Sequence, residues 1–182
     1  MKYLARFIMW LAGWEYKGEL PAEKKAVIIS VPHTSNWDFF WGELAFLSQG
    51  IPAFILMKKE FFFFPLGMIL RALNVIPVDR GNKDSQLVEQ MITEFKQRDS
   101  MYLCITPEGS RKKRKKWKKG FLVIAKAAGV PVYLGRIDYK GKYCEVGPLF
   151  YPTEDVDADL AYIMSTYHDA NPKYPENFSN GN

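Results

Sequence analysis

Residues 26–42 read AVIISVPHTSNWDFFWG, and this stretch contains the pattern that decides the fold. Its first part is apolar and rich in β-branched side chains up to Pro32, which is typical of a buried strand. The polar residues 34–36 offer helix N-caps, and residues 37–48 have a helical pattern that Gly-Ile-Pro at 50–52 ends. The stretch therefore predicts a buried strand, a polar loop and a helix.

The same alternation continues along the chain. Further strands are predicted at 53–58, 75–78, 101–106, 130–139 and 143–150, the last two joined as a hairpin. Further helices are predicted at 61–74, 85–98, 120–129 and 158–170, followed by a polar tail. With 182 residues, 48% of them hydrophobic, the chain can bury one sizeable core. The pattern predicts a single α/β domain with a mixed, mostly parallel sheet flanked by helices.

The cysteines, histidines and serine motifs of the chain disfavour a disulfide framework, a transition-metal site and a serine hydrolase. Cys104 and Cys144 lie in apolar or alternating stretches, so we expect reduced core residues in a cytosolic protein. The two histidines are scattered and no cysteine pair is present, which disfavours a transition-metal site. There is no G-x-S-x-G motif, which disfavours a serine hydrolase.

The net charge of +5 is concentrated in one segment, RKKRKKWKK at 111–119. This basic segment holds eight of the 25 Lys and Arg residues, so the remaining 17 face 20 acidic residues. A local anionic partner is therefore expected. Anionic lipid headgroups fit best, because the acidic remainder of the chain offers no nucleic-acid recognition module. There are two alternatives. The segment could bind nucleic acid through phosphate contacts and stacking by Trp117, or it could be a solvated loop without a partner.

The first 16 residues, MKYLARFIMWLAGWEY, predict an interfacial membrane-contact helix. The uninterrupted apolar run at 7–14 has eight residues, whereas spanning a bilayer takes about 20. The apolar positions that recur at helical spacing are Leu4, Phe7, Ile8 and Leu11. Trp10 and Trp14 are amphipathic, and Lys2 and Arg6 can meet lipid headgroups. The alternatives are a helix packed on its own domain and a signal peptide.

A second candidate for membrane contact is the run Phe61 to Phe64, followed by Met68 and Ile69. Four successive phenylalanines cannot all share one helical face, so some must point away from the core or lie in a turn. The alternative is that the run fills the core of the domain. Together with the basic segment, these contacts predict peripheral binding at the cytoplasmic face of a membrane.

One of the two histidines, His33, lies in the polar loop after the first predicted strand, five residues before Asp38. If the helix begins at residue 35 or 36, Asp38 lies in its first turn and can reach back to one imidazole nitrogen. The other nitrogen is then free to act as a general base toward a hydroxyl group. The alternative is that Asp38 only supports the helix N-terminus and His33 bonds to backbone.

Two more polar clusters follow predicted strands, namely Asp79-Arg80 and the PEGSR segment at 107–111. Because the carboxyl ends of parallel strands meet at one edge of a sheet, we expect both clusters to lie near His33. A glycine turn, a serine hydroxyl and a bidentate arginine suit a phosphate group, and Arg80 is a second cation. Alternatively, Arg80 pairs with Asp79 and Arg111 belongs to the solvated basic segment.

The motifs also resemble a known family in their order and spacing. They are His33-x4-Asp38, KKEFFFFPLGMILRALNVIPVDRGN at 58–82, PEGSR at 107–111 and VPV at 130–132. This set is similar to that of the PlsC-type glycerophospholipid acyltransferases, which are 1-acyl-sn-glycerol-3-phosphate acyltransferase-like members of the lysophospholipid acyltransferase superfamily. The resemblance covers about residues 25–140 and implies a glycerol-3-phosphate acyltransferase-like fold and an acyltransferase domain at 17–182.

The resemblance also implies an activity. Members of the family move a fatty acyl chain from acyl-CoA or acyl carrier protein to the free hydroxyl of a lysophospholipid such as 1-acyl-sn-glycerol 3-phosphate, in phospholipid biosynthesis. No bound cofactor is expected, since the acyl donor is a substrate. Another lysolipid acceptor is the alternative within the family, and a non-catalytic lipid-binding or nucleic-acid-binding module is the alternative outside it.

The functional residues of the family can be assigned to this chain motif by motif. The motif histidine is the general base and the aspartate its partner, which implies catalytic roles for His33 and Asp38. Acceptor binding is implied for Arg80, Glu108, Gly109, Ser110 and Arg111, and for Lys58 with a less defined role. Ser110 replaces the usual threonine of the family and keeps the hydroxyl group.

Overall fold

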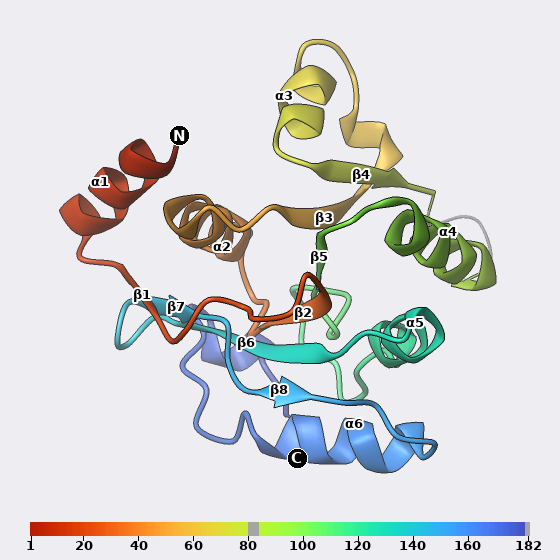
Figure 1. The fold of residues 1–182 in the computed structure, drawn as a ribbon. Helices are drawn as coiled ribbons and strands as arrows, with labels where there is room; N and C mark the ends of the chain where they lie inside the picture. Colours follow the sequence, from red (N-terminus) through yellow and green to blue (C-terminus); the bar gives the residue numbers. More distant parts are fainter. Residues whose placement is uncertain (80–83, 181–182) are drawn as a thin grey trace.

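The computed structural model describes residues 1–79 and 84–180, which form one α/β domain (Figure 1). Its strands form a single sheet in the order β1-β7-β6-β2-β5-β3-β4, with β8 paired to β6. The strands are β1 (Glu15–Lys17), β2 (Lys25–Val31), β3 (Ala53–Lys58), β4 (Val75–Val78), β5 (Met101–Ile105), β6 (Val132–Asp138), β7 (Tyr143–Glu145) and β8 (Leu149–Phe150). The helices are α1 (Lys2–Ala12), α2 (Asn36–Gln49), α3 (Leu66–Ala72), α4 (Asp84–Gln97), α5 (Gly120–Ala128) and α6 (Val156–Ser165). The predicted mixed, mostly parallel sheet is confirmed.

Strand β2 lies at the centre of the sheet and is parallel to both of its neighbours, β5 and β6. Val27, Ile29 and Val31 point to the face that α4, α5 and α6 cover, and Ala26 and Ile28 point to the face under α2. All five side chains are buried, which explains why the strand reads as a continuous apolar run. The parallel strands β6, β2, β5, β3 and β4 end at the same edge of the sheet.

Helix α2 begins where the polar residues of the sequence place it. Ser35 is the N-cap, and its hydroxyl accepts a hydrogen bond from the Trp37 N–H. Asp38 returns the contact by accepting from the Ser35 N–H, which completes a capping box. The helix ends at Gly50, whose left-handed backbone conformation lets the chain turn toward β3.

The predicted strand at 143–150 is two strands rather than one. Strand β7 pairs with the end of β6 and β8 pairs with its beginning, and Gly147 lies between them. A Cβ atom at Gly147 would lie 2.1 Å from the Leu134 carbonyl oxygen, so only glycine allows this close approach of the two backbones. Strand β1 also extends the sheet beside β7, which the sequence pattern did not predict.

Helix α1 packs on α2 through Ala5 and Met9, while its other face is exposed. Two details differ from the interfacial helix that the sequence predicts. Trp14 is buried and its ring stacks on that of Trp41, with centroids 4.5 Å apart. Lys2 and Arg6 donate to the carbonyl oxygens at the C-terminal end of α2, at 3.2 and 2.8 Å, where a cation is favourable.

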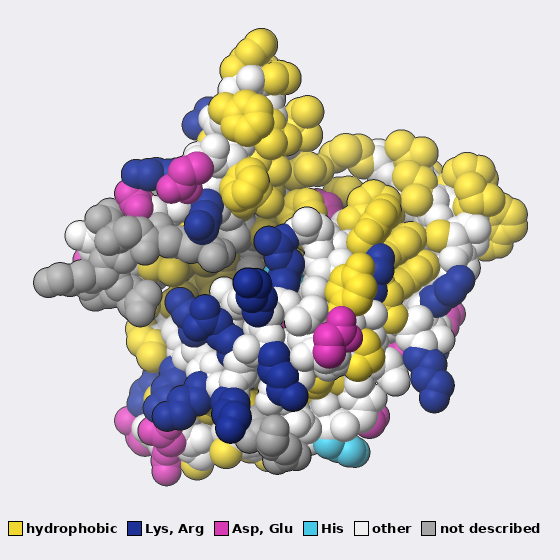
Figure 2. All heavy atoms as spheres, turned by 180° about the vertical axis from the view of Figure 1, so that it is seen from behind, with side chains coloured by type: hydrophobic (Ala, Val, Ile, Leu, Met, Phe, Trp, Pro, Cys, Tyr) yellow, Lys and Arg dark blue, Asp and Glu magenta, His cyan; other side chains and the backbone are white. Residues whose placement is uncertain are grey.

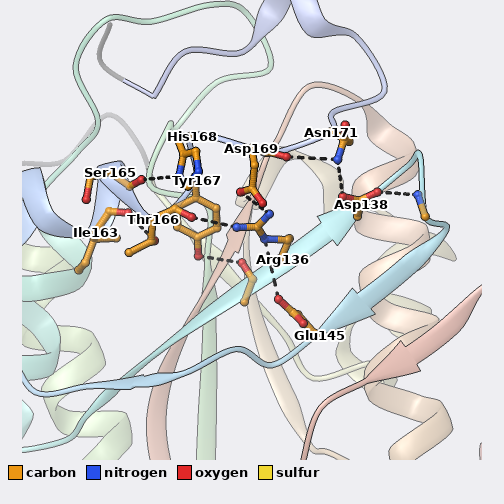
Figure 3. A network of polar contacts seen from close by, with 12 residues as sticks. Arg136, Asp138, Glu145, Ile163, Ser165, Thr166, Tyr167, His168, Asp169 and Asn171 are labelled. Atoms are coloured by element: carbon orange, nitrogen blue, oxygen red, sulfur yellow. Dashed lines mark hydrogen bonds and ion pairs between the residues drawn. The ribbon is translucent and has the colours of Figure 1, made fainter.

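The residues after α6 are not a polar tail but a strap that crosses the carboxyl edge of the sheet. We call residues 166–179 the C-terminal strap. Its first part is held by Arg136, which bonds to the Thr166 carbonyl at 2.9 Å and to Asp169 at 2.8 Å (Figure 3). Its middle is held by Asn171, whose amide donates to Asp138 at 2.7 Å. The strap therefore lies next to the loops that follow β6 and β2.

Candidate active site

His33 lies just after β2, at the carboxyl edge of the sheet, with its Nδ1 atom 3.3 Å from Oδ2 of Asp38. Nδ1 is buried against this carboxylate, although the contact lacks the alignment of a hydrogen bond. About a fifth of the His33 side chain stays exposed. The pair is therefore brought together as predicted, and the His33 ring keeps part of its surface accessible.

The Asp38 carboxylate is buried and holds the loop that carries His33. Its Oδ2 atom accepts from the backbone N–H groups of Thr34 and Ser35, each at 2.7 Å. Its Oδ1 atom accepts from the Tyr139 hydroxyl at 2.6 Å. The two alternatives for Asp38 are thus both present, because the same side chain supports the helix N-terminus and contacts His33.

Tyr139 is a part of the site that the sequence analysis did not single out. It follows directly after β6, which is the neighbour of β2 in the sheet. Its ring packs edge-on against that of Trp14. Burial, and the hydrogen bond to Asp38, raise the pKa of Tyr139, so its hydroxyl stays protonated and acts as a donor to Asp38. Its position at the end of the strand predicted at 130–139 is the sequence signal for it, because polar groups at the carboxyl ends of parallel strands gather at one edge.

Glu108 lies after β5 and is turned toward His33 rather than toward solvent. Its Oε2 atom accepts from the His33 backbone N–H at 2.6 Å, and its Oε1 atom is buried without a hydrogen-bond partner. Burial raises the pKa of Glu108 to about 8, with the His33 N–H opposing the shift and the Asp38 charge adding to it. This carboxyl group therefore braces the His33 loop, and its binding of an acceptor stays a prediction.

The rest of the PEGSR segment forms a tight turn. Gly109 has a left-handed backbone with φ of 63°, and a Cβ atom there would lie 3.1 Å from the side chain of Lys118. The Ser110 hydroxyl accepts from the Lys112 N–H at 3.1 Å and so closes the turn. The Arg111 side chain is exposed. The turn thus lies beside the His33 loop, with its arginine at the surface.

The other two predicted cations follow the strands β3 and β4. Lys58 ends β3 and its side chain is exposed, while its neighbour Lys59 forms an ion pair with Asp79. Arg80 lies outside the described residues. The predicted acceptor contact of Arg80 and its alternative, a pair with Asp79, therefore both stay predictions.

The position of Trp117 disfavours the alternative in which the tryptophan of the basic segment stacks on nucleic-acid bases. Trp117 is buried, and its indole N–H donates to the Ser179 carbonyl of the strap at 2.9 Å. Its ring also packs against Tyr167 and Phe178. Trp117 therefore fixes the segment to the domain, and base stacking by this residue would need its removal from the core.

The described residues contain no group of three or more His, Cys, Asp and Glu side chains arranged to hold a metal ion. A small apolar cavity lies under α2 among Gly42, Ala45 and Ile137, and neither His33 nor Asp38 lines it. The edge itself carries the His33–Asp38 pair, with the exposed cations Arg111 after β5 and Lys58 at the end of β3. Both cysteine thiols are buried, and burial raises the pKa of Cys104 to about 12, which disfavours a thiolate nucleophile.

Comparison with known proteins agrees with this geometry. The family model described as Acyltransferase matches residues 14–134, about two thirds of the chain. The fold is similar to the crystal structure of the 1-acyl-sn-glycerophosphate (LPA) acyltransferase PlsC from Thermotoga maritima, with a TM-score of 0.65 and 19% sequence identity. That match covers 88% of this chain and 72% of the other. No curated protein matches the chain at a significant level.

The matched region contains β2 with His33, α2 with Asp38 and β5 with Glu108, while Tyr139 lies beyond its end. The resemblance drawn from four short motifs is confirmed over a continuous stretch. The chain belongs to the acyltransferase family, with the fold of PlsC.

Proposed function

We propose that this acyltransferase moves a fatty acyl chain from acyl-CoA or acyl carrier protein to the free hydroxyl of a lysophospholipid such as 1-acyl-sn-glycerol 3-phosphate, as a step of phospholipid biosynthesis. The observation that carries the proposal is the buried contact of 3.3 Å between His33 Nδ1 and Asp38 Oδ2 at the carboxyl edge of the sheet. The family membership and the fold support acyl transfer, and the motif residues support a lipid acceptor.

The proposed reaction is a direct transfer with His33 as the general base. Its Nε2 atom takes the proton of the acceptor hydroxyl while the oxygen attacks the thioester carbonyl. The C–S bond then breaks, and the proton passes from the imidazolium to the departing thiolate. Asp38 stabilises the imidazolium through its charge and holds the ring in place. A buried carboxylate at this distance suits that role, and both cysteine thiols are buried in apolar clusters.

Acceptor binding is proposed for the turn after β5 and the cations beside it. The exposed guanidinium of Arg111 can bind a phosphate bidentately, and Lys58 can add a second charge. Arg80 completes the proposed set. Glu108 and Gly109 shape the loop that presents these groups, through the His33 N–H bond and the left-handed backbone.

We also propose that the enzyme works as a peripheral protein on the cytoplasmic face of a membrane. Large apolar side chains are exposed on α1, on α2 and around α3: Tyr3, Leu4, Phe7, Trp10, Leu11, Trp37, Phe40, Phe61, Phe63, Phe64, Met68 and Ile69. They cover the top and upper right of the face in Figure 2, and Lys and Arg side chains gather below them. The described residues contain no helix long and apolar enough to cross a membrane.

This arrangement supports apolar insertion with electrostatic attraction to anionic lipids. Phe64 is 84% exposed, which favours membrane contact over a core role for the end of the phenylalanine run. Replacing Phe63 and Phe64 by Ser should weaken binding to anionic liposomes by at least tenfold, while the matched change Tyr151→Ser should not. Equal binding by both variants in a liposome flotation assay would contradict the contact.

The activity itself is tested with a panel of lysolipids. Purified protein is incubated with each acceptor and with labelled acyl-CoA or acyl carrier protein, and the products are identified by mass spectrometry. We expect a diacyl product with a phosphate-bearing acceptor and none with the His33→Ala variant. Hydrolysis of the donor without transfer to any acceptor would contradict the proposed function.

A further inference from the structure

The C-terminal strap brings one lysine, Lys173, to the edge of the sheet that carries His33. The Tyr139 N–H donates to the Asn171 carbonyl at 3.0 Å, and the Tyr174 N–H donates to the Thr34 hydroxyl at 3.3 Å. Lys173 lies between these two contacts, which join the strap to the residues following β6 and β2. Its position is therefore set by the same loops that position the catalytic pair.

The ammonium group of Lys173 is held by aromatic rings instead of by a carboxylate. It lies 4.9 Å from the ring centroid of Trp37, 5.8 Å from that of Tyr174 and 6.0 Å from that of Tyr139. Within residues 1–79 and 84–180, no acidic side chain forms an ion pair with it. Aromatic faces attract a cation but carry no net charge, so they fix the ammonium without neutralising it.

The carboxylates on neighbouring loops already have other partners. Asp38 accepts from the Tyr139 hydroxyl and from two backbone N–H groups. Asp138 accepts from the Asn171 amide at 2.7 Å and from the Gly141 N–H at 2.6 Å. The positive charge of Lys173 therefore stays available for an anion that comes from outside the chain.

The position of Lys173 also separates it from the cations that the motifs assign to the acceptor. Its aromatic neighbours lie on α2, on the strap and after β6, on one side of β2 in the sheet. Arg111 and Lys58 follow β5 and β3, on the other side of β2. His33 thus has cationic groups on both flanks.

We propose that Lys173 binds a phosphate group of one of the two substrates, as a binding residue contributed by the strap. The proposal rests on the proposed function, in which direct transfer places a thioester donor and a lysolipid acceptor at His33 together. Both carry phosphate: the donor on its pantetheine arm, whether CoA or carrier protein, and the acceptor on its glycerol. Two anions held at one site repel each other, so separate cations on the two flanks of His33 favour their simultaneous binding.

The test compares Lys173→Gln and Lys173→Arg with the wild-type chain in steady-state acyl transfer. Losing one charge-assisted contact costs roughly 10- to 100-fold in affinity, so the Gln variant should raise the KM of one substrate by that factor. Its kcat should change by less than about threefold, and the Arg variant should keep most of the affinity, because it keeps the charge. The substrate whose KM rises identifies the phosphate.

The matched control is Lys140→Gln, which makes the same charge change at an exposed residue of the hairpin turn after β6. It should leave both KM values unchanged. A Lys173→Gln variant with both KM values at the wild-type level, or with a loss confined to kcat, overturns the proposal. A loss that Lys173→Arg does not rescue also overturns it, since this indicates packing of the strap and not charge.

A second measurement keeps this inference separate from the proposed function. Binding of coenzyme A and of monomeric 1-acyl-sn-glycerol 3-phosphate is measured by calorimetry, without turnover. If no acceptor is acylated by the wild type, the proposed function fails, but a selective loss of binding of one ligand by Lys173→Gln still supports the phosphate site. Equal binding of both ligands by wild type and variant, or no binding by either protein, overturns it.

Discussion

The Asp38 carboxylate supports the N-terminus of α2 and, in the proposed mechanism, also assists His33, and the two roles can be separated by Asp38→Asn and Asp38→Ala. In the Asn variant, the amide oxygen can replace Oδ2 as the acceptor from Thr34 and Ser35, and the amide nitrogen can donate to the Tyr139 oxygen. Each of the three contacts can thus keep a hydrogen bond, the one with Tyr139 in the reverse direction, while the charge is lost. In the Ala variant, the two buried backbone donors and the half-buried Tyr139 hydroxyl lose their partner.

The structure gives the magnitude of each effect. Hydrogen bonds to a charged acceptor exceed neutral ones by about 1 kcal/mol, so Asn should cost roughly 1–2 kcal/mol of unfolding free energy. Each donor left unsatisfied costs about 1–3 kcal/mol, so Ala should cost at least about 3 kcal/mol. For a chain of 182 residues, about 2–4 °C of Tm per kcal/mol predicts a loss of roughly 2–8 °C for Asn.

The catalytic effect follows from the distance to His33. A carboxylate 3.3 Å from an imidazolium gains about 5 kcal/mol at an effective dielectric constant of about 20. Because the His33 ring is partly exposed, this is an upper bound, equivalent to between 10³- and 10⁴-fold in rate. We expect Asp38→Asn to lower kcat by about 10²- to 10³-fold at saturating acceptor, while the protein stays folded.

The assay pairs thermal unfolding with single-turnover acyl transfer on the same preparations. A rate loss of about 10²- to 10³-fold in Asp38→Asn, with a Tm loss of no more than about 8 °C, supports the charge interaction with His33. An Asn variant that retains more than a third of the wild-type rate would show that Asp38 serves only the helix N-terminus. An Ala variant as stable as the Asn variant would refute the reasoning about these three donors.

Three further outcomes can be checked on the same site. His33→Ala should lose about 10²- to 10⁴-fold in rate with an unchanged circular dichroism spectrum, and near-normal turnover would end the general-base assignment. Arg111→Ala should weaken use of a phosphorylated acceptor by about 10- to 100-fold, and Arg111→Lys should be impaired too, whereas the KM of the donor should not change. Burial raises the pKa of Glu43 to about 7, so its proton is bound more tightly in the folded than in the unfolded chain, and stability falls as pH rises from about 4.5 to 7. Glu43→Gln should therefore be more stable than wild type by about 1–3 kcal/mol at pH 8 and equal to it at pH 4, as measured by urea unfolding.

The strand ends of the parallel sheet could be predicted from the sequence because buried strands read as continuous apolar runs. The strands at 53–58 and 75–78 agree with the structure at both ends, and the His33–Asp38 contact follows from a loop and a capping box. These features depend on local chain chemistry, in which turn residues, caps and apolar periodicity act within a few residues of each other.

The parts that could not be predicted depend on contacts between distant segments. Nothing near Tyr139 in the sequence shows that its hydroxyl reaches Asp38, about 100 residues earlier. Trp117 looks solvated among lysines, yet the strap buries it. The polar composition of the strap alone predicts a tail. Its polar groups instead bond to Arg136 and Asp138, which lie far from it in the sequence.

The long sequence separations within the site bear on the order in which it forms during synthesis. Asp38 emerges early, but the tyrosine that bonds it lies 101 positions later, and the contact between Thr34 and Tyr174 spans 140 positions. Domains are made from the N-terminus, and such non-local contacts form late in folding. A nascent chain on the ribosome would thus carry the histidine without its finished surroundings. Acyl transfer would begin only once residues 166–179 have docked across the sheet.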